Sequence, residues 1–349
     1  MSAPESDVKP VVAEQSKQDA PAAPETAVNT EEKPTGLNKE TPLGQLASKL
    51  GELLESTGHH EMYGVELSSW QEGTDLPIPQ QVILQKFLRA NANDVAKASE
   101  QLKAALKWRK EFQALKTKDE VFEKSRFEGL GYITELKDMP GSATGRDVAV
   151  FNIYGAVKDN KKTFGDLDGF MRWRVALMEL TVARLDIANA TTPVPDYGKG
   201  PDPYQAVQIH DYLSVSFLRQ APEVKAASSK TIQLFQQVYP ETMSKKFFVN
   251  VPIVMQWMFG AMKYLMAKET IAKMQWMSYG NQLDQYLGPS VPKVYGGSGA
   301  DLTAVGETPK YNDATATTTP AATKTEPPAA AAATGLDAKK GEEEGAVKV

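Results

Sequence analysis

The chain has 349 residues, with 39 basic and 44 acidic side chains, a net charge of −5 and no cysteine. General nucleic-acid binding requires a basic surface, so the acidic balance argues against that function and we expect no nucleic-acid partner. The lack of cysteine excludes disulfides, zinc–thiolate sites, iron–sulfur clusters and thiol nucleophiles.

Both ends of the chain are biased in composition. Residues 1–40 are rich in Ala, Pro, Glu, Lys and Thr, and residues 301–349 form a second biased segment, most strongly from residue 311 onwards. Such segments bury too little apolar surface to offset their ordering entropy, so we predict two disordered tails. The N-terminus also lacks the apolar core of a signal peptide, which favours a cytoplasmic protein.

The first predicted folded region, residues 41–116, is helical. A helix over 42–54 is indicated by four leucines at helical spacing, Leu43, Leu46, Leu50 and Leu53. Residues 80–112 predict two further helices with a break at 91–93, and Asp94 is expected to cap the second of them. We expect only helices before residue 115.

The second region, residues 117–300, alternates between strands and helices. Strands are predicted over 148–154, 207–217, 246–251 and from 273, with long helices over 168–186 and 222–239. This alternation implies an α/β fold with a mainly parallel or mixed sheet and helices packed on it.

The most apolar stretch runs from Phe247 to Met266. It is interrupted by Asn250, Pro252, Gln256, Gly260 and Lys263, which together argue against a membrane-spanning helix. An amphipathic helix that contacts a membrane surface is the preferred interpretation.

Six short motifs appear along the chain in an order that resembles the CRAL-TRIO family of fungal phosphatidylinositol transfer proteins. They are the segments 86–90, 94–98, 106–110, 239–241, 248–252 and 292–297, which read KFLRA, DVAKA, LKWRK, YPE, FVNVP and PKVYGG. The resemblance implies an N-terminal helical CRAL-TRIO bundle followed by a CRAL-TRIO lipid-binding domain. It also implies an apolar pocket under a gate helix at 252–266 and transient, peripheral contact with the endoplasmic reticulum, microsomal or plasma membrane.

The same resemblance implies phosphatidylinositol as a ligand and names three headgroup residues. Glu241, Thr270 and Lys273 match the family positions that contact the inositol phosphate. A lysine and a hydroxyl suit the phosphodiester, and a carboxylate suits the sugar hydroxyls. A basic pair that the family carries after the Leu88-Arg89-Ala90 motif is replaced by Asn91-Ala92, which removes two cations.

The strand around His210 carries the most unusual pattern. Successive strand residues point to opposite faces, so Val207, Ile209 and Asp211 share one face. Gln208, His210 and Tyr212 share the other, which is polar for a sheet covered on both sides. We therefore expect a ligand that is not purely aliphatic against this second face.

His210 and Tyr212 stand where ordinary lipid-transferring members carry apolar residues, and this resembles the haem-binding branch of the family. The branch implies haem b as cofactor, with Tyr212 as the ligand of ferric iron. His210, Tyr154, Arg174 and Lys246 match the positions around the haem. We assign Arg174 to the tyrosinate or a propionate, and Lys246 to a propionate. His210 and Tyr212 would approach the iron from the same side, so only Tyr212 is expected to be axial.

A serine hydrolase is the main enzymatic alternative, because His210 adjoins Asp211. These two side chains are expected on opposite faces, and the chain has no Gly-x-Ser-x-Gly elbow, so we predict a carrier or sensor and no enzyme. Three hypotheses stay open. The chain binds haem and serves phosphoinositide homeostasis or an oxidant or haem response; it transfers and presents phosphatidylinositol without haem; or it is a scaffold around another apolar ligand.

Overall fold

The computed structural model describes residues 37–142, 144–215, 221–253 and 271–312. The chain divides into two compact units. The first comprises the chain up to Gln113 with Val182–Gln205 and Ile232–Ser244, and the second comprises Ala114–Thr181, Ala206–Thr231 and the chain from Lys245 onwards. The predicted gate helix at 252–266 and most of both predicted tails lie outside the described residues.

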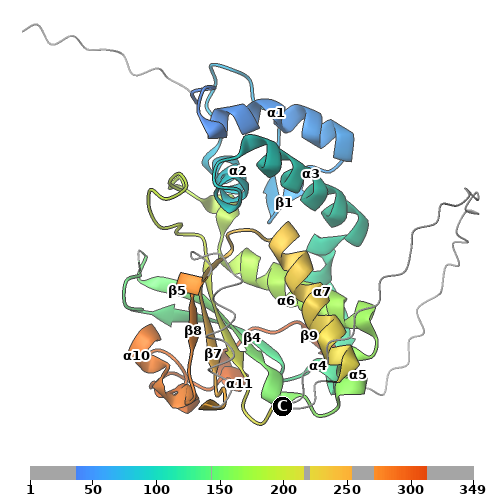
Figure 1. Cartoon of the computed structure of the whole chain (residues 1–349), viewed down its shortest axis with the longest axis vertical. Helices are drawn as coiled ribbons and strands as arrows, with labels where there is room; N and C mark the ends of the chain where they lie inside the picture. Colours follow the sequence, from blue (N-terminus) through green and yellow to red (C-terminus); the bar gives the residue numbers. More distant parts are fainter. Residues whose placement is uncertain (1–36, 143, 216–220, 254–270, 313–349) are drawn as a thin grey trace, which may run out of the picture. The chain divides into compact units, whose positions relative to one another are not determined.

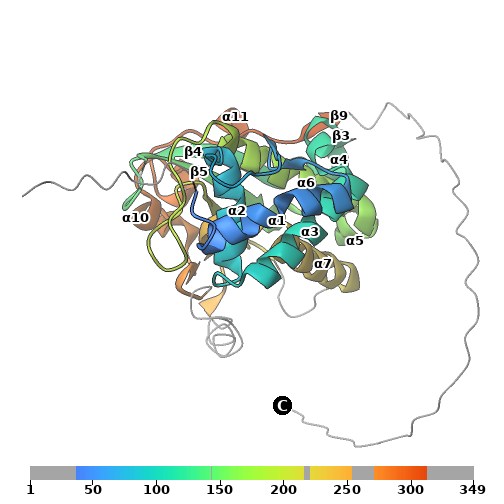
Figure 2. The same ribbon diagram turned by 90° about the horizontal axis from the view of Figure 1, so that it is seen from above.

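Three helices form the core of the first unit. They are α1 (Pro42–Thr57), α2 (Ile78–Ala90) and α3 (Val95–Phe112), which pack pairwise against one another (Figures 1 and 2). Asp94 caps α3 by accepting a hydrogen bond from the backbone N–H of Lys97 at 3.1 Å, and a short helix, η3 (Ile187–Asn189), follows later in the chain. The three predicted helices, the break before α3 and its cap are thus confirmed.

The expectation that only helices precede residue 115 is wrong. β1 (Glu61–Met62) and β2 (Val65–Glu66) form an antiparallel hairpin between α1 and α2. Tyr63 and Gly64 form its turn with positive φ angles of 56° and 80°, the backbone that a tight two-residue hairpin needs. Strands of two residues are too short to show an alternating pattern in the sequence.

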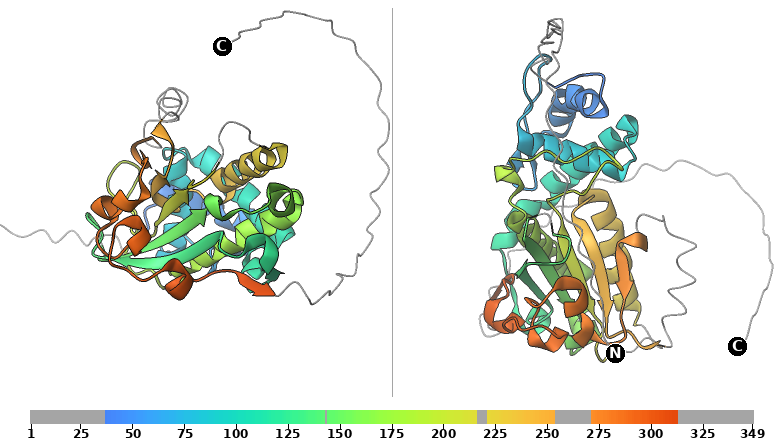
Figure 3. Two further views of the ribbon diagram at one scale, coloured as in Figure 1. Left: turned by 90° about the horizontal axis from the view of Figure 1, so that it is seen from below. Right: turned by 90° about the vertical axis from the view of Figure 1, so that its left-hand side faces the viewer.

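The second unit is built on a five-stranded mixed sheet in the order β4-β5-β6-β7-β8 (Figure 3). The strands are β4 (Gly131–Lys137), β5 (Arg146–Ile153), β6 (Ala206–Asp211), β7 (Met243–Val249) and β8 (Met274–Trp276). β4 is antiparallel to β5, whereas β5 and β6, and β7 and β8, are parallel pairs. The mixed sheet confirms the predicted fold class.

The two faces of this sheet have different coverings. One face packs on the segment that contains η5 (Gly280–Gln282), α10 (Asp284–Leu287), η6 (Lys293–Tyr295) and α11 (Leu302–Val305), through buried residues such as Phe151, Ile209 and Leu283. On the other side lies α6 (Leu167–Arg184), and α7 (Pro222–Val238) follows β6 in the chain (Figures 1 and 3). The second face is therefore bordered by α6.

The folded part of the chain extends beyond the predicted boundary at residue 300. β9 (Lys310–Asn312) pairs in parallel with β3 (Val121–Glu123), and the Trp173 indole N–H donates to the Tyr311 hydroxyl at 3.2 Å. Strand pairing and the half-buried Tyr311 therefore hold residues that the average composition assigns to the predicted tail. The remaining short helices are η1 (Ala114–Asp119), α4 (Lys124–Phe127), η2 (Tyr154–Ala156) and α5 (Asn160–Phe164).

Candidate functional site

The strand that carries His210 is shorter than predicted. β6 ends at Asp211 and not near residue 217, because the chain turns at Leu213-Ser214, where Ser214 has a φ of 66°. Tyr212 follows directly and its backbone N–H donates to the Val249 carbonyl at 3.0 Å, so the residue stays beside β7. The predicted alternation therefore holds as far as Tyr212 and fails beyond it.

Asp211 is fixed on the face of the sheet that packs on the C-terminal segment. Its two carboxylate oxygens accept hydrogen bonds from the Tyr295 hydroxyl and from the Asn250 side-chain amide, both at 2.8 Å, and a third comes from the Leu213 N–H at 2.8 Å. These partners lie on the side opposite His210. The prediction that Asp211 and His210 point to opposite faces is confirmed, and Asp211 has a structural role.

Aromatic side chains line the other face of the sheet across three neighbouring strands. We define this aromatic face by the residues Tyr154, His210, Tyr212, Phe248 and Trp276. The Tyr154 ring lies 5.5 Å from the His210 ring and 5.1 Å from the Tyr212 ring, measured between centroids. Phe248 lies 5.6 Å from His210 and 6.2 Å from Tyr212, and stacks on Trp276 at 5.2 Å with an interplanar angle of 5°. The structure thus brings the predicted Tyr154, His210 and Tyr212 together and adds two rings that the sequence did not point out.

His210 is a buried, neutral imidazole. Its side chain is 5% exposed, and its Nε2 atom lies 3.3 Å from the Gln208 side-chain oxygen. Burial, followed by the positive charges of Lys246 and Arg174, holds the pKa of His210 well below its ordinary value. A neutral ring at this position can sit beside a metal-binding group without adding charge.

Tyr212 carries a protonated phenol in the ligand-free protein. Burial raises the pKa of Tyr212 and the neighbouring Tyr154 raises it further, because a phenolate is poorly solvated there. Burial also raises the pKa of Tyr154, while the buried guanidinium of Arg174 acts in the opposite direction. The positive charge of Arg174 therefore acts on Tyr154, His210 and Lys246.

Lys246 supplies a second cation to the aromatic face. Burial and the charge of Arg174 lower the pKa of Lys246 to about 8. Its ammonium group lies 5.2 Å from the centroid of the Phe248 ring, and none of the carboxylates in the described parts of the chain forms an ion pair with it. A half-buried ammonium without a carboxylate is costly, so this position favours an anionic group on a ligand.

Of the predicted headgroup residues, Glu241 lies in the first unit, at a positive φ of 52°. Its carbonyl accepts hydrogen bonds from the Lys86 ammonium at 2.9 Å and from the Gln205 amide at 3.1 Å. Gln205 also donates to the Glu241 carboxylate at 3.2 Å, and the Arg89 Nε lies 3.8 Å from the same oxygen. The Glu241 side chain is therefore oriented by its neighbours.

Lys86 holds the loop around Glu241 in place. Its side chain is fully buried and donates to the Asp202 carboxylate at 2.6 Å and to the Tyr204 carbonyl at 2.7 Å. Burial lowers the pKa of Lys86, and Asp202 opposes that change.

The other two predicted headgroup residues are Lys273 and Thr270. Lys273 lies in the second unit, where its carbonyl accepts a hydrogen bond from the Lys246 backbone N–H at 2.7 Å. Thr270 lies outside the described residues.

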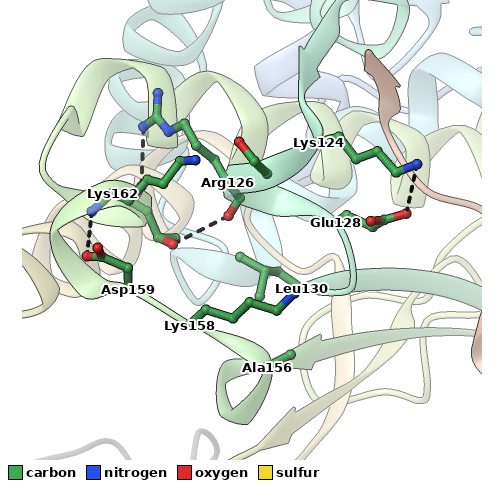
Figure 4. Close-up of a pocket in the computed structure, with 10 residues that line it drawn as sticks. Lys124, Arg126, Glu128, Leu130, Ala156, Lys158, Asp159 and Lys162 are labelled. Carbon is green, nitrogen blue, oxygen red and sulfur yellow. Dashed lines mark hydrogen bonds and ion pairs between the residues drawn. The ribbon is translucent and has the colours of Figure 1, made fainter. Parts of the chain in front are cut away.

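A small polar pocket of about 250 Å³ lies elsewhere in the second unit (Figure 4). Three of its four lining cations form ion pairs with carboxylates of the same region: Lys124 with Glu128 at 3.7 Å, Arg126 with Asp166 at 3.0 Å and Lys162 with Glu123 at 3.3 Å. The fourth is Lys158, and the carboxylate of Asp159 also lines the pocket. Figure 4 shows the Lys124–Glu128 pair at one side of the pocket. The positive charges are balanced locally, so this pocket does not favour an anionic ligand and we assign it no binding role.

The family of the chain follows from comparison with known proteins. The model of the CRAL/TRIO domain matches residues 144–297, and that of the CRAL/TRIO N-terminal domain matches residues 39–104. With the relatives below, this shows that the chain belongs to the CRAL-TRIO family, as its motifs predicted. Among the described residues, no helix is both long enough and apolar enough to cross a bilayer.

Two curated fungal relatives carry the name phosphatidylinositol transfer protein SFH5. The protein from Phaeosphaeria nodorum is 53% identical over 293 residues, which cover 82% of this chain and 86% of that protein. The protein from Cryptococcus neoformans is 45% identical over 272 residues, which cover 76% and 89%. A crystal structure of Sfh5 matches with a TM-score of 0.63 and 26% identity, covering 77% of this chain and 92% of that one.

Proposed function

We propose that this chain is a non-classical phosphatidylinositol transfer protein that binds haem b, with Tyr212 as the ligand of the ferric iron. The observation that carries the haem assignment is the aromatic face. It combines a phenol, a buried neutral imidazole and an ammonium group that lacks a carboxylate partner in the described parts of the chain. A flat, aromatic dianion with a metal centre is the ligand class that matches all three groups.

The residues present fit such a cofactor. Haem would supply a ferric iron, a Lewis acid to which a tyrosinate can bind. Tyr212 would hold the iron after its phenol gives up the proton that burial retains in the ligand-free protein. Lys246 and Arg174 would neutralise the two propionates, and Phe248 and Trp276 would flank the ring system. His210 would remain neutral beside Tyr212.

The test is a hemin titration of purified ligand-free protein, followed through the Soret band. We expect saturable binding with the spectrum of a five-coordinate ferric tyrosinate, and its loss in Tyr212→Phe. Tyr279→Phe is the matched control, because Tyr279 is 59% exposed and is not one of the residues of the aromatic face. An unchanged spectrum in Tyr212→Phe, or no Soret shift on adding hemin to the wild-type protein, would rule out the assignment.

A second candidate is an ordinary phosphatidylinositol transfer protein that binds no haem. It is favoured by the names of the curated relatives and by the oriented carboxylate of Glu241, which suits the hydroxyls of inositol. Transfer of labelled phosphatidylinositol between vesicles tests it. We expect transfer to fall in Lys273→Ala, with phosphatidylcholine transfer as the control. A colourless wild-type protein that transfers phosphatidylinositol would favour this candidate over haem binding.

Both candidates describe a carrier or sensor, with no catalytic step. We assign the chain to the cytoplasm with transient, peripheral contact to a membrane surface, and to phosphoinositide homeostasis or the response to oxidants or haem. Vesicle co-sedimentation tests the membrane contact directly: the protein should be found mainly in the supernatant and be enriched in the pellet only when ligand exchange is possible.

A further inference from the structure

Phe248 occupies the centre of the aromatic face. β7 alternates like β6, so Lys246 and Phe248 share this face while Phe247 and Val249 are buried in the core cluster on the other side. The Phe248 ring contacts His210 and Tyr212 on β6 and stacks on Trp276, its register partner on β8. One side chain therefore connects three neighbouring strands.

The same ring also contacts the cation. The Lys246 ammonium lies 5.2 Å from the Phe248 centroid, a distance at which the ring quadrupole attracts a cation. Phe248 thus touches both the group proposed to bind iron and the group proposed to bind a carboxylate. Its position fixes the spacing between these two groups.

We infer that Phe248 is a positioning residue that aligns Tyr212 and Lys246 for the two ends of one flat ligand, and that it makes the face selective for a porphyrin over an acyl chain. This inference rests on the proposed haem function. The clustered rings form a rigid apolar surface. A rigid macrocycle loses little conformational freedom on such a surface, whereas a flexible acyl chain loses much more.

The matched variants lie next to each other in the chain. Phe248→Ala and Phe248→Leu remove the ring from the aromatic face, and Phe247→Leu removes a ring from the opposite face, where Phe247 is 2% exposed. We expect the Phe248 variants to bind both hemin and metal-free protoporphyrin IX about 2- to 12-fold more weakly, the range of one aromatic contact. Phe247→Leu should lower the melting temperature and leave both affinities within about 2-fold.

Two further readouts separate positioning from simple destabilisation. The high-spin ferric signal in electron paramagnetic resonance should change its rhombicity in Phe248→Leu and keep it in Phe247→Leu, because Phe248 contacts the Tyr212 ring and Phe247 lies on the opposite face. The amount of phosphatidylinositol taken up from vesicles should stay unchanged in Phe248→Leu. Phe248→Leu preserves apolar volume, so it carries the test if Phe248→Ala does not fold.

The outcomes distinguish this inference from the function on which it rests. If the wild-type protein binds hemin through Tyr212 and folded Phe248→Leu keeps wild-type porphyrin affinity and rhombicity, the positioning role is refuted and the haem function stands. If Phe248→Leu loses lipid and porphyrin equally, the selectivity is refuted. If the wild-type protein binds no hemin, the proposed haem function itself has failed.

Discussion

Replacing Lys246 by methionine removes a half-buried ammonium that has no carboxylate partner in the described parts of the chain. Its pKa is lowered from 10.5 to about 8, so keeping the group charged at pH 7 costs the folded protein ~3 kcal/mol before allowance for partial solvent screening. Methionine has a similar length and no charge. We therefore expect Lys246→Met to raise the free energy of unfolding by ~1–3 kcal/mol at pH 7 in the absence of ligand.

The stability difference between Lys246→Met and the wild-type protein should depend on pH. The folded-state pKa of Lys246 is depressed, so the cost is fully present below pH 8 and declines as the pH rises from about 8 towards 10.5. Urea unfolding of the two proteins at pH 7, 8.5 and 9.5 should show a difference that shrinks with pH. Lys245→Met, on the opposite side of β7, is the control. Equal stabilities of Lys246→Met and wild type at pH 7, or a difference that does not vary with pH, would refute the reasoning.

Three other perturbations test the neighbouring parts of the fold. Tyr295→Phe removes a donor from the buried Asp211 carboxylate and should lower the free energy of unfolding by ~1.5–3 kcal/mol in a urea titration, with hemin binding unchanged. Lys86→Met leaves the buried Asp202 unpaired and should cost ~3–5 kcal/mol, of which the double variant with Asp202→Leu should recover a substantial part; no recovery would contradict the ion-pair argument. His210 takes up a proton more readily in the unfolded chain, because its folded-state pKa is lowered, so stability should fall below pH 6.5 by up to ~1.4 kcal/mol per pH unit. His210→Gln should flatten that acid limb in unfolding curves measured between pH 4 and 7, and an identical slope would show that other groups cause it.

Much of the fold could be predicted from local patterns. Long apolar stripes predicted the helices α1, α3 and α6 with their ends within a few residues of those observed. Runs of β-branched and aromatic residues predicted the strands β5, β6 and β7. The misses have different causes. β4 is an edge strand with a mixed pattern, and β1 and β2 have two residues each, too few to show alternation. β3 and β9 have three residues each and pair with each other although they are far apart in the sequence.

The part of the candidate site that lies on or next to β6 could be predicted from the sequence of that strand alone. Alternation along β6 correctly separated Asp211 from His210 and Tyr212. The same rule applied to β7 would have placed Lys246 and Phe248 on one face. This alternation is the signal in the sequence that could have identified Phe248 as part of the aromatic face. Trp276 could not be found in this way, because its register opposite Phe248 is set by tertiary pairing. Neither could the orientation of Glu241, which depends on Lys86 and Gln205 from other parts of the chain.

The placement of Asp211 between His210 and Tyr212 has a consequence for how such a protein can change its cargo. The Asp211 carboxylate holds one side of the sheet through Tyr295 and Asn250, while the rings of its two neighbours contact Tyr154 on the aromatic face. Exchanging those two neighbours for aliphatic residues would alter the binding chemistry and leave the rear hydrogen bonds intact. Under the proposed function, substitutions at two positions would thus be enough to exchange a haem-binding face for an apolar one, while the hydrogen bonds of Asp211 remain in place.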